Sequence, residues 1–184
     1  AANEQLLWHS TGRADPELIY ANGMEGFKPL ISFPVIPVRS GRPRRMANMA
    51  YGPGTYLAKH PLYCDAIRPH TRPADDPRDS GCRQLLVARA ALGNVEDYGR
   101  EYVTELDVNP PVGHHSRSGT EKDCKFLHGP GWIPAEKEAK RWRADHPFQR
   151  MLDNGAEYGR QYVVSRAYQL YPAYVVTYTN PNAA

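Results

Sequence analysis

The sequence has few cysteines, no long apolar run and little excess charge of either sign. Three cysteines, Cys64, Cys82 and Cys124, are widely spaced, and no Cys-x-x-Cys pair occurs. This pattern predicts free thiols in a reducing compartment, either cytoplasmic or nuclear, rather than a disulfide framework. No run is apolar enough for a transmembrane helix, and no signal-peptide pattern is present, so we expect no membrane partner. A formal net charge of +3 does not by itself demand a nucleic-acid partner.

The length and the turn-forming residues indicate one loop-rich domain. A chain of 184 residues can enclose one core but not comfortably two. Seventeen prolines and fifteen glycines argue against a helical bundle, because proline breaks helix interiors and strand ladders. The start at Ala1-Ala2-Asn3, just before an apolar run, suggests a single domain over residues 1–184, excised from a longer protein.

Hydrophobic patterning places the main elements. Buried or half-buried strands are predicted at residues 6–9, 84–92, 161–165 and 174–178, and a short one at 112–115. A helix is predicted at 17–21, with Asp15 as its cap and Pro16 in its first turn. A tight turn at 51–54 leads into 55–58, and a short helix follows to residue 67. Residues 134–143 read as a further exposed helix, and residues 68–81 as a polar loop.

A long segment, residues 27–50, has no clear period and contains four prolines. Loops of this length in compact domains are usually binding loops or lids, or else disordered. The segment carries four arginines: Arg39, Arg42, Arg44 and Arg45. They are either solvated surface charges or contacts for a phosphate-bearing ligand or nucleic acid, and the sequence leaves both interpretations open.

Four segments occur in an order that carries a family resemblance. They are LLWHSTG at 6–12, YGPGTYLA at 51–58 followed by Tyr63, the GC…LLVA…ALGN stretch at 81–94, and QYVV at 161–164 followed by Tyr171-Pro172. Together they resemble the catalytic domain of the poly(ADP-ribose) polymerases, over nearly the whole chain. The resemblance implies the ADP-ribosyltransferase fold: an α+β domain of two packed, mostly antiparallel β-sheets with short helices. It also implies NAD as co-substrate.

The resemblance also implies a set of site residues. The catalytic set is His9, Tyr56 and Gln161, and the NAD-binding set is His9, Ser10, Thr11, Tyr56, His60 and Tyr63. Tyr56 and Tyr63 would stack on either side of the nicotinamide ring, an arrangement that aromatic faces favour. His9 and Thr11 would hold the adenosine-side ribose, since a neutral imidazole offers one donor and one acceptor to a hydroxyl. Ser10 would bind the nicotinamide amide through its backbone.

The same resemblance gives the arginine-rich segment a role. Residues 27–50 fall where the family carries the loop that covers the adenine and the pyrophosphate, so the arginines would offset pyrophosphate charge. No glycine-rich cradle of the Rossmann or P-loop type is present. NAD would therefore be held by the family's own geometry.

Three positions depart from the family pattern. Ser10 stands where glycine is more usual, His60 where relatives carry a hydroxyl, and Gln161 where they carry the catalytic glutamate. Glutamine keeps a hydrogen bond to a ribose hydroxyl but has neither charge nor basicity, and loss of a general base typically costs ~10²–10⁴ in rate. Polymer synthesis is therefore not expected. Glu157, four positions upstream, could in principle supply a carboxylate, although an exposed loop acid is the plainer interpretation.

The sequence therefore predicts a mono-ADP-ribosyltransferase that moves ADP-ribose from NAD to a protein or nucleic-acid acceptor and releases nicotinamide. Two alternatives stay open: an NAD glycohydrolase, and a catalytically inactive NAD-binding interaction module. No metal site is expected. His114 and His115 with Cys124 and His128 are suitable zinc-ligand types, but their spacing matches no ligand pattern.

Overall fold

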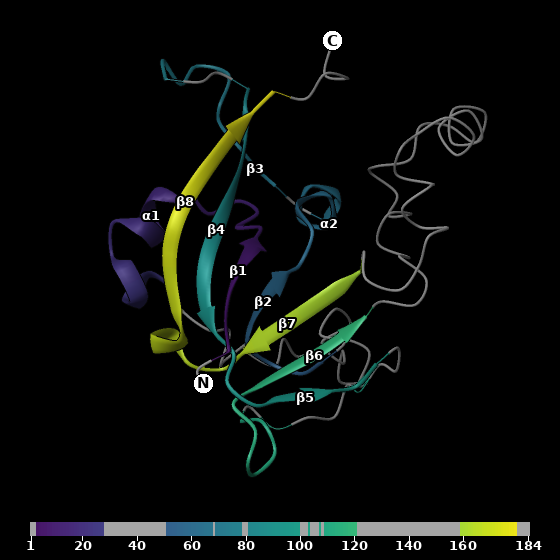
Figure 1. Ribbon diagram of the computed structural model, residues 1–184. Coiled ribbons are helices and arrows are strands. Elements are labelled where there is room, and N and C mark those ends of the chain that lie inside the picture. Colours follow the sequence, from purple (N-terminus) through teal and green to yellow (C-terminus); the bar gives the residue numbers. More distant parts are fainter. Residues whose placement is uncertain are drawn as a thin grey trace, which may run out of the picture.

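The structure is a computed structural model that describes residues 3–27, 51–67, 69–78, 81–99, 103, 107, 109–120 and 159–179. These residues form one sheet of eight strands in the order β3-β4-β1-β2-β7-β6-β5, with β8 paired to β4 (Figure 1). The strands are β1 Glu4–His9, β2 Thr55–Ala58, β3 His70–Thr71, β4 Arg83–Ala91, β5 Val95–Asp97, β6 Ser116–Thr120, β7 Arg160–Val164 and β8 Leu170–Tyr178. The helices are α1 Glu17–Tyr20 and α2 Pro61–Ile67, with 3-10 turns η1 Gly23–Gly26 and η3 Ala167–Gln169.

The sheet is mixed but mostly antiparallel, and only β5 and β6 pair in parallel. The expectation of a mostly antiparallel sheet architecture with short helices is confirmed, but the expectation of two separate sheets is wrong. β2 pairs with β7 from Thr55↔Val164 to Ala58↔Gln161, and this ladder makes one continuous sheet of the two groups of strands. The strands twist strongly from one group to the other (Figure 1), as right-handed strand twist requires.

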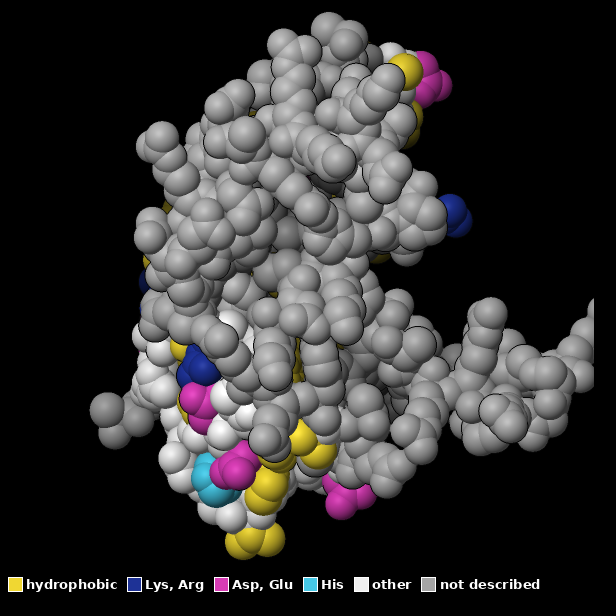
Figure 2. All heavy atoms as spheres, turned by 90° about the vertical axis from the view of Figure 1, so that its right-hand side faces the viewer, with side chains coloured by type: hydrophobic (Ala, Val, Ile, Leu, Met, Phe, Trp, Pro, Cys, Tyr) yellow, Lys and Arg dark blue, Asp and Glu magenta, His cyan; other side chains and the backbone are white. Residues whose placement is uncertain are grey.

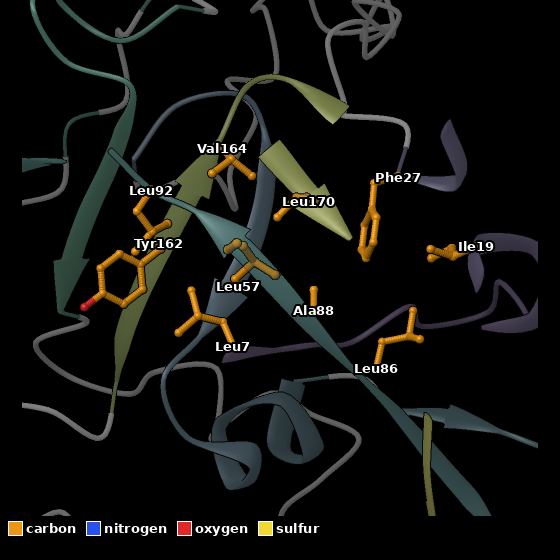
Figure 3. Close-up of a cluster of buried hydrophobic side chains, with 11 residues drawn as sticks. Leu7, Ile19, Phe27, Leu57, Leu86, Ala88, Leu92, Tyr162, Val164 and Leu170 are labelled. Atoms are coloured by element: carbon orange, nitrogen blue, oxygen red, sulfur yellow. The ribbon is translucent and has the colours of Figure 1, made fainter. Parts of the chain in front are cut away.

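One face of the sheet carries the hydrophobic core (Figure 3). Its strand residues include Leu7, Leu57, Leu86, Tyr162 and Val164, which alternate with residues on the other face. The α1–η1 segment and the start of β8 complete this core with Ile19, Phe27 and Leu170. Helix α2 instead contacts β1, β2 and β4 through the opposite face, on which its Asp65 binds Arg83 of β4. Among the described residues, no helix has the length and apolarity to cross a membrane.

Most of the elements with a strong apolar period are confirmed. β1, β4 and β7 match the predicted strands at 6–9, 84–92 and 161–165 to within two residues, β8 begins four residues before the predicted 174–178, and α2 ends at Ile67 as expected. Helix α1 is a single turn, and the Asp15 carboxylate accepts the Glu17 N–H at 2.9 Å. Gly23, just after this turn, has a φ of +56°, which a side chain would rarely tolerate. The predicted helix at 134–143 lies outside the described residues, as does the arginine-rich segment after Phe27.

Two expectations are wrong. Residues 112–115 do not form a strand: the His114 N–H donates to the Pro111 carbonyl at 2.9 Å in a turn, and the strand starts at Ser116. The segment 68–81, interpreted as a loop, contains the short strand β3, which pairs with Arg83 and Gln84. Strands β3 and β6 were not predicted because most of their side chains are polar.

Strand β6 reads Ser-Arg-Ser-Gly-Thr, yet all five residues are buried. Its two serines have specific partners: Ser116 donates to the Leu92 carbonyl at 2.8 Å, and Ser118 to the Asp97 carboxylate at 3.0 Å. Gly119 is required by its neighbour, since a Cβ there would lie 2.1 Å from Cε1 of the Tyr51 ring. Hydrogen bonds and one close aromatic contact therefore replace hydrophobic alternation in this strand.

Gly119→Ala is expected to destabilise the fold by about 1–3 kcal/mol, the usual range for overpacking a core. The cause is the Tyr51 ring, which would have to move away from the new methyl group. Chemical denaturation of Gly119→Ala, with and without Tyr51→Leu, isolates this contact as a double-mutant cycle. The alanine should cost little in the Tyr51→Leu background. An equal cost in both backgrounds would contradict the account.

Candidate functional site

The candidate site is centred on a contact between β7 and α2. The Gln161 amide Nε2 donates to the Tyr63 hydroxyl at 2.5 Å, and both side chains are buried, with 5% and 4% of their surface exposed. These residues are 98 positions apart in the chain. Gln161 is placed by the β2–β7 ladder, and Tyr63 by the helix that follows β2. The fold therefore brings together two of the residues that the sequence nominated for NAD.

The strand register places Tyr56 on the same face of the sheet as Gln161. Tyr56 lies opposite Val163, and Ala58 opposite Gln161, so Tyr56 and Gln161 project to one side of the sheet from adjacent strands. This is the face opposite the hydrophobic core, because the core residue Leu57 alternates with Tyr56 and Ala58. The face that bears Tyr56 and Gln161 is called the site face below.

The Tyr56 hydroxyl is held from two sides. It donates to the Gly52 carbonyl at 2.7 Å and accepts the Tyr51 backbone N–H at 3.0 Å. Burial raises the pKa of the Tyr56 phenol above its usual range. Tyr56 is therefore neutral at physiological pH, and its ring is fixed by the tight turn that precedes β2.

His9 projects to the core face and not to the site face, since it shares one side of β1 with Leu7, whereas Trp8 lies opposite Ala58. His9 ends β1 opposite Leu86, and its Nδ1 lies 2.8 Å from the Tyr56 carbonyl oxygen. Its ring contacts Phe27 edge to face, with the ring centroids 5.7 Å apart. Burial lowers the pKa of His9, although the hydrogen bond to Tyr56 opposes this effect. A carbonyl oxygen only accepts, so the neutral ring carries its proton on Nδ1 and presents Nε2 as an acceptor.

The other three nominated residues, Ser10, Thr11 and His60, lie in the segments that follow β1 and precede α2. Ser10 follows β1 directly and is half-buried. The Thr11 hydroxyl donates to the Ala14 carbonyl at 2.6 Å, so it serves a local turn. His60 precedes α2, where its carbonyl accepts the Tyr63 N–H at 3.2 Å. Glu157 and the arginines at positions 39, 42, 44 and 45 lie outside the described residues.

A cavity of about 410 Å³ lies away from these residues, between β8, β4 and α1. Its lining includes Tyr20, Arg72, Gln84 and Thr177. Arg72 pairs with Asp76 at 2.9 Å, and the Gln84 amide oxygen, in the orientation that satisfies both its polar atoms, accepts from Arg72 and Thr177. The side chains of Arg72, Gln84 and Thr177 are therefore engaged within the protein, and none of the nominated residues lines this cavity.

His114 and His115 have structural partners. His114 Nε2 lies 2.8 Å from the Glu96 carboxylate, and His115 Nδ1 accepts the Asn94 N–H at 3.0 Å. No group of three or more metal-ligating side chains occurs in the part of the chain that the structure describes. Cys124 and His128 lie outside it. The Cys64 thiol is buried, and burial raises its pKa to about 12, so this cysteine is no nucleophile at neutral pH.

Two residues of the site face were missed from sequence. Tyr51, fully buried, covers Gly119 beside Gln161 and stacks on Tyr98, with ring centroids 6.5 Å apart. Arg117 lies opposite Val163, the partner of Tyr56. Tyr51 belonged to a quoted motif, but only the packing shows its position. Nothing in the sequence indicated that Arg117 is buried in a strand, because the polar residues around it are typical of a loop.

The space-filling view from the right-hand side of Figure 1 shows a few described charged side chains, of which one basic side chain lies beside an acidic one (Figure 2). No family model matches the chain, and no curated protein matches it. The functional argument therefore depends on the motifs and on the contacts described above.

The depressed pKa of His9 makes stability depend on pH. Between pH 7.5 and 5 the unfolded chain binds a proton near the usual value of 6.5, whereas folded His9 binds it only at lower pH. Acid therefore favours the unfolded state across this window. We expect the free energy of unfolding to fall from pH 7.5 to 5, and to fall less in His9→Asn, which keeps a donor near the Nδ1 position.

Urea unfolding at several pH values measures this slope. Aspartates with lowered pKa values, such as Asp97, also reduce the free energy of unfolding when they are protonated, but only at more acidic pH. Identical slopes for wild type and His9→Asn over pH 7.5 to 5 would show that His9 does not titrate as described.

Proposed function

We propose that this protein is a mono-ADP-ribosyltransferase domain that uses NAD as co-substrate. One observation carries the proposal: the 2.5 Å contact of Gln161 with Tyr63, on the face to which Tyr56 also projects. A sequence resemblance alone does not require these three residues to converge. Their convergence from β2, α2 and β7 supports a common site.

The residues present suit the parts of NAD. Tyr56 and Tyr63 supply aromatic rings for the nicotinamide. The Nε2 of neutral His9 is an acceptor suited to a ribose hydroxyl, but His9 contacts Tyr56 only at its backbone and projects to the core face. In the reaction, the bond between nicotinamide and the ribose C1′ breaks, and nicotinamide leaves with the bonding electron pair as a neutral molecule. The acceptor's nucleophile forms the new bond to C1′ and loses a proton to solvent or to a base.

Gln161 limits this chemistry to one transfer. Its neutral amide can hydrogen-bond a ribose hydroxyl, but it cannot remove that hydroxyl's proton to make it the next nucleophile. It also places no negative charge beside the cationic C1′ of the transition state. The protein therefore attaches a single ADP-ribose per acceptor site, and a carboxylate, where the reaction needs one, comes from elsewhere.

A non-catalytic NAD-binding module is the second candidate. It is favoured by the fact that the buried Gln161, and not a carboxylate, is bonded to Tyr63. The carboxylates of Asp65 and Glu96 on the same face are engaged by Arg83 and His114. An NAD glycohydrolase would differ only in using water as acceptor. Intact-mass measurement after incubation with NAD, together with nicotinamide release, separates the three: added mass indicates transfer, release alone hydrolysis, and neither a binding module.

Gln161→Glu should speed nicotinamide release by at least about tenfold, within the ~10²–10⁴ range attributed to a general base. Glutamate has nearly the same shape, so charge is what changes. Burial raises the pKa of a carboxyl group at this position, and the gain should therefore increase with pH between about 6 and 8. Gln161→Ala, which lacks the hydrogen bond as well, should fall below wild type.

Nicotinamide release measured by chromatography checks this series. Long polymers made by the wild-type protein would rule out the role given to Gln161. Equal, measurable activity of wild type and Gln161→Ala would remove Gln161 from the site. If all three proteins bind NAD without releasing nicotinamide, the binding module replaces the transferase.

Tyr63→Ala should weaken NAD binding by ~1–3 kcal/mol, taking base stacking on aromatic rings as the analogue. Tyr63→Phe is the matched control, because it keeps the ring and loses only the hydroxyl that accepts from Gln161. Calorimetry with both variants separates stacking from hydrogen bonding. Unchanged affinity in Tyr63→Ala would exclude stacking on this ring.

A further inference from the structure

Arg117 lies in the middle of β6 with only 1% of its surface exposed. Its Nη2 donates to two backbone carbonyl oxygens, those of Asp107 at 2.5 Å and of Asn109. Its Nε and Nη1 have no hydrogen-bond partner among the described residues. Because a guanidinium stays charged at all physiological pH values, β6 contains a buried cation with unused donors.

The nearby described carboxylates are engaged elsewhere. Glu96 lies across from Arg117 in the β5–β6 register, but its carboxylate binds His114 at 2.8 Å. The next residue, Asp97, binds Arg160 at 2.7 Å. Burying a charge without an ionic partner is costly, and an apolar side chain would fill a strand interior more cheaply. The carboxylates of Glu96 and Asp97 therefore do not offset the charge of Arg117.

The position of Arg117 ties it to the site face. Tyr56 lies opposite Val163 on β7, and Val163 lies opposite Arg117 on β6, so all three project to the same side of the sheet. Burial is the main cause of the raised pKa of the Tyr56 phenol, and the positive charge of Arg117 acts against it. The charge of the guanidinium is therefore felt at Tyr56.

We propose that Arg117 is the receptor for an oxyanion of the ligand, with its Nε and Nη1 N–H groups as donors. The ligand class is a phosphate- or carboxylate-bearing molecule. This inference rests on the proposed function in one respect: it places the oxyanion on the same face as Tyr56 and Gln161. An arginine suits this role because its planar guanidinium pairs with carboxylate or phosphate oxygens through several directed hydrogen bonds.

Thermal denaturation with inorganic pyrophosphate, ADP-ribose or sodium acetate tests the proposal, with sodium chloride at equal ionic strength as reference. The wild-type Tm should rise with at least one oxyanion beyond the chloride reference, because a ligand that binds only the folded state stabilises it. A rise with pyrophosphate and ADP-ribose assigns a phosphate source, and a rise with acetate alone assigns a carboxylate. Samples are equilibrated before each scan, since access to a side chain this buried requires local opening.

Arg117→Met is the decisive variant, and Arg89→Met is its matched control. Arg89 is an exposed strand arginine paired with Glu4, so its loss changes the net charge equally. Arg117→Met should lose the oxyanion effect, with affinity at least tenfold weaker by calorimetry, while Arg89→Met keeps it. Without added anion, Arg117→Met should be no less stable than wild type, since a buried charge is removed.

Two results would overturn the proposal. The first is a wild-type Tm that no oxyanion raises beyond chloride, which would mean that another part of the chain satisfies Arg117. The second is an oxyanion effect that survives in Arg117→Met. If Arg117→Met does not fold, Arg117→Lys replaces it: the charge remains but the Nε donor and the planar fork are lost, so weaker oxyanion binding is again expected. If the protein binds oxyanions but releases no nicotinamide from NAD, the result supports the role of Arg117 and contradicts the transferase. If it releases nicotinamide but oxyanions leave its Tm unchanged, the result supports the transferase and contradicts the role of Arg117.

Discussion

The pairing of β2 with β7 is the constraint on which the rest of the structure depends. It joins β3, β4, β1 and β8 to β6 and β5, although about a hundred residues separate its two strands in the chain. The same ladder places Tyr56 and Gln161 on one face and leaves Leu57, Tyr162 and Val164 for the core. A one-residue slip in this register would exchange the two faces. The core and the candidate site are therefore specified by one set of backbone hydrogen bonds.

The charge of the site face sets the chemistry open to it. A transferase must accommodate a developing cation at C1′, which a neighbouring carboxylate stabilises and a neighbouring cation does not. Among the described residues this face offers the neutral amide of Gln161 and the guanidinium of Arg117, while its carboxylates Asp65 and Glu96 are paired with Arg83 and His114. Such a face is better suited to hold the anionic part of a dinucleotide than to drive bond cleavage alone. An acceptor that brings its own carboxylate would reconcile the two requirements.

The sequence predicts those strands whose burial depends on apolar side chains. β1, β4 and β8 bury apolar residues that alternate or run together, and they were located from that pattern. β6 was not located, because Ser116 and Ser118 gain their burial from hydrogen bonds to Leu92 and Asp97 that no local pattern encodes. The division into two sheets failed for a related reason: it depended on long-range pairing between β2 and β7. The motifs nominated Tyr56, Tyr63 and Gln161, which the structure places close together, whereas Arg117 lies outside any motif and was not nominated.

The hydrogen bond from Gln161 to Tyr63 shows that a single side-chain substitution can change the charge of the site without a change in the backbone. Gln161 donates its amide N–H to the Tyr63 hydroxyl, so Tyr63 acts there as an acceptor. An ionised glutamate at the same position has no hydrogen to donate, and Tyr63 would have to become the donor. Strand register, helix position and side-chain shape would all stay the same, while the bond reverses and a negative charge appears. Under the proposed function, the fold would set where the ligand lies, and the charge at position 161 would set whether the ligand is cleaved or only held.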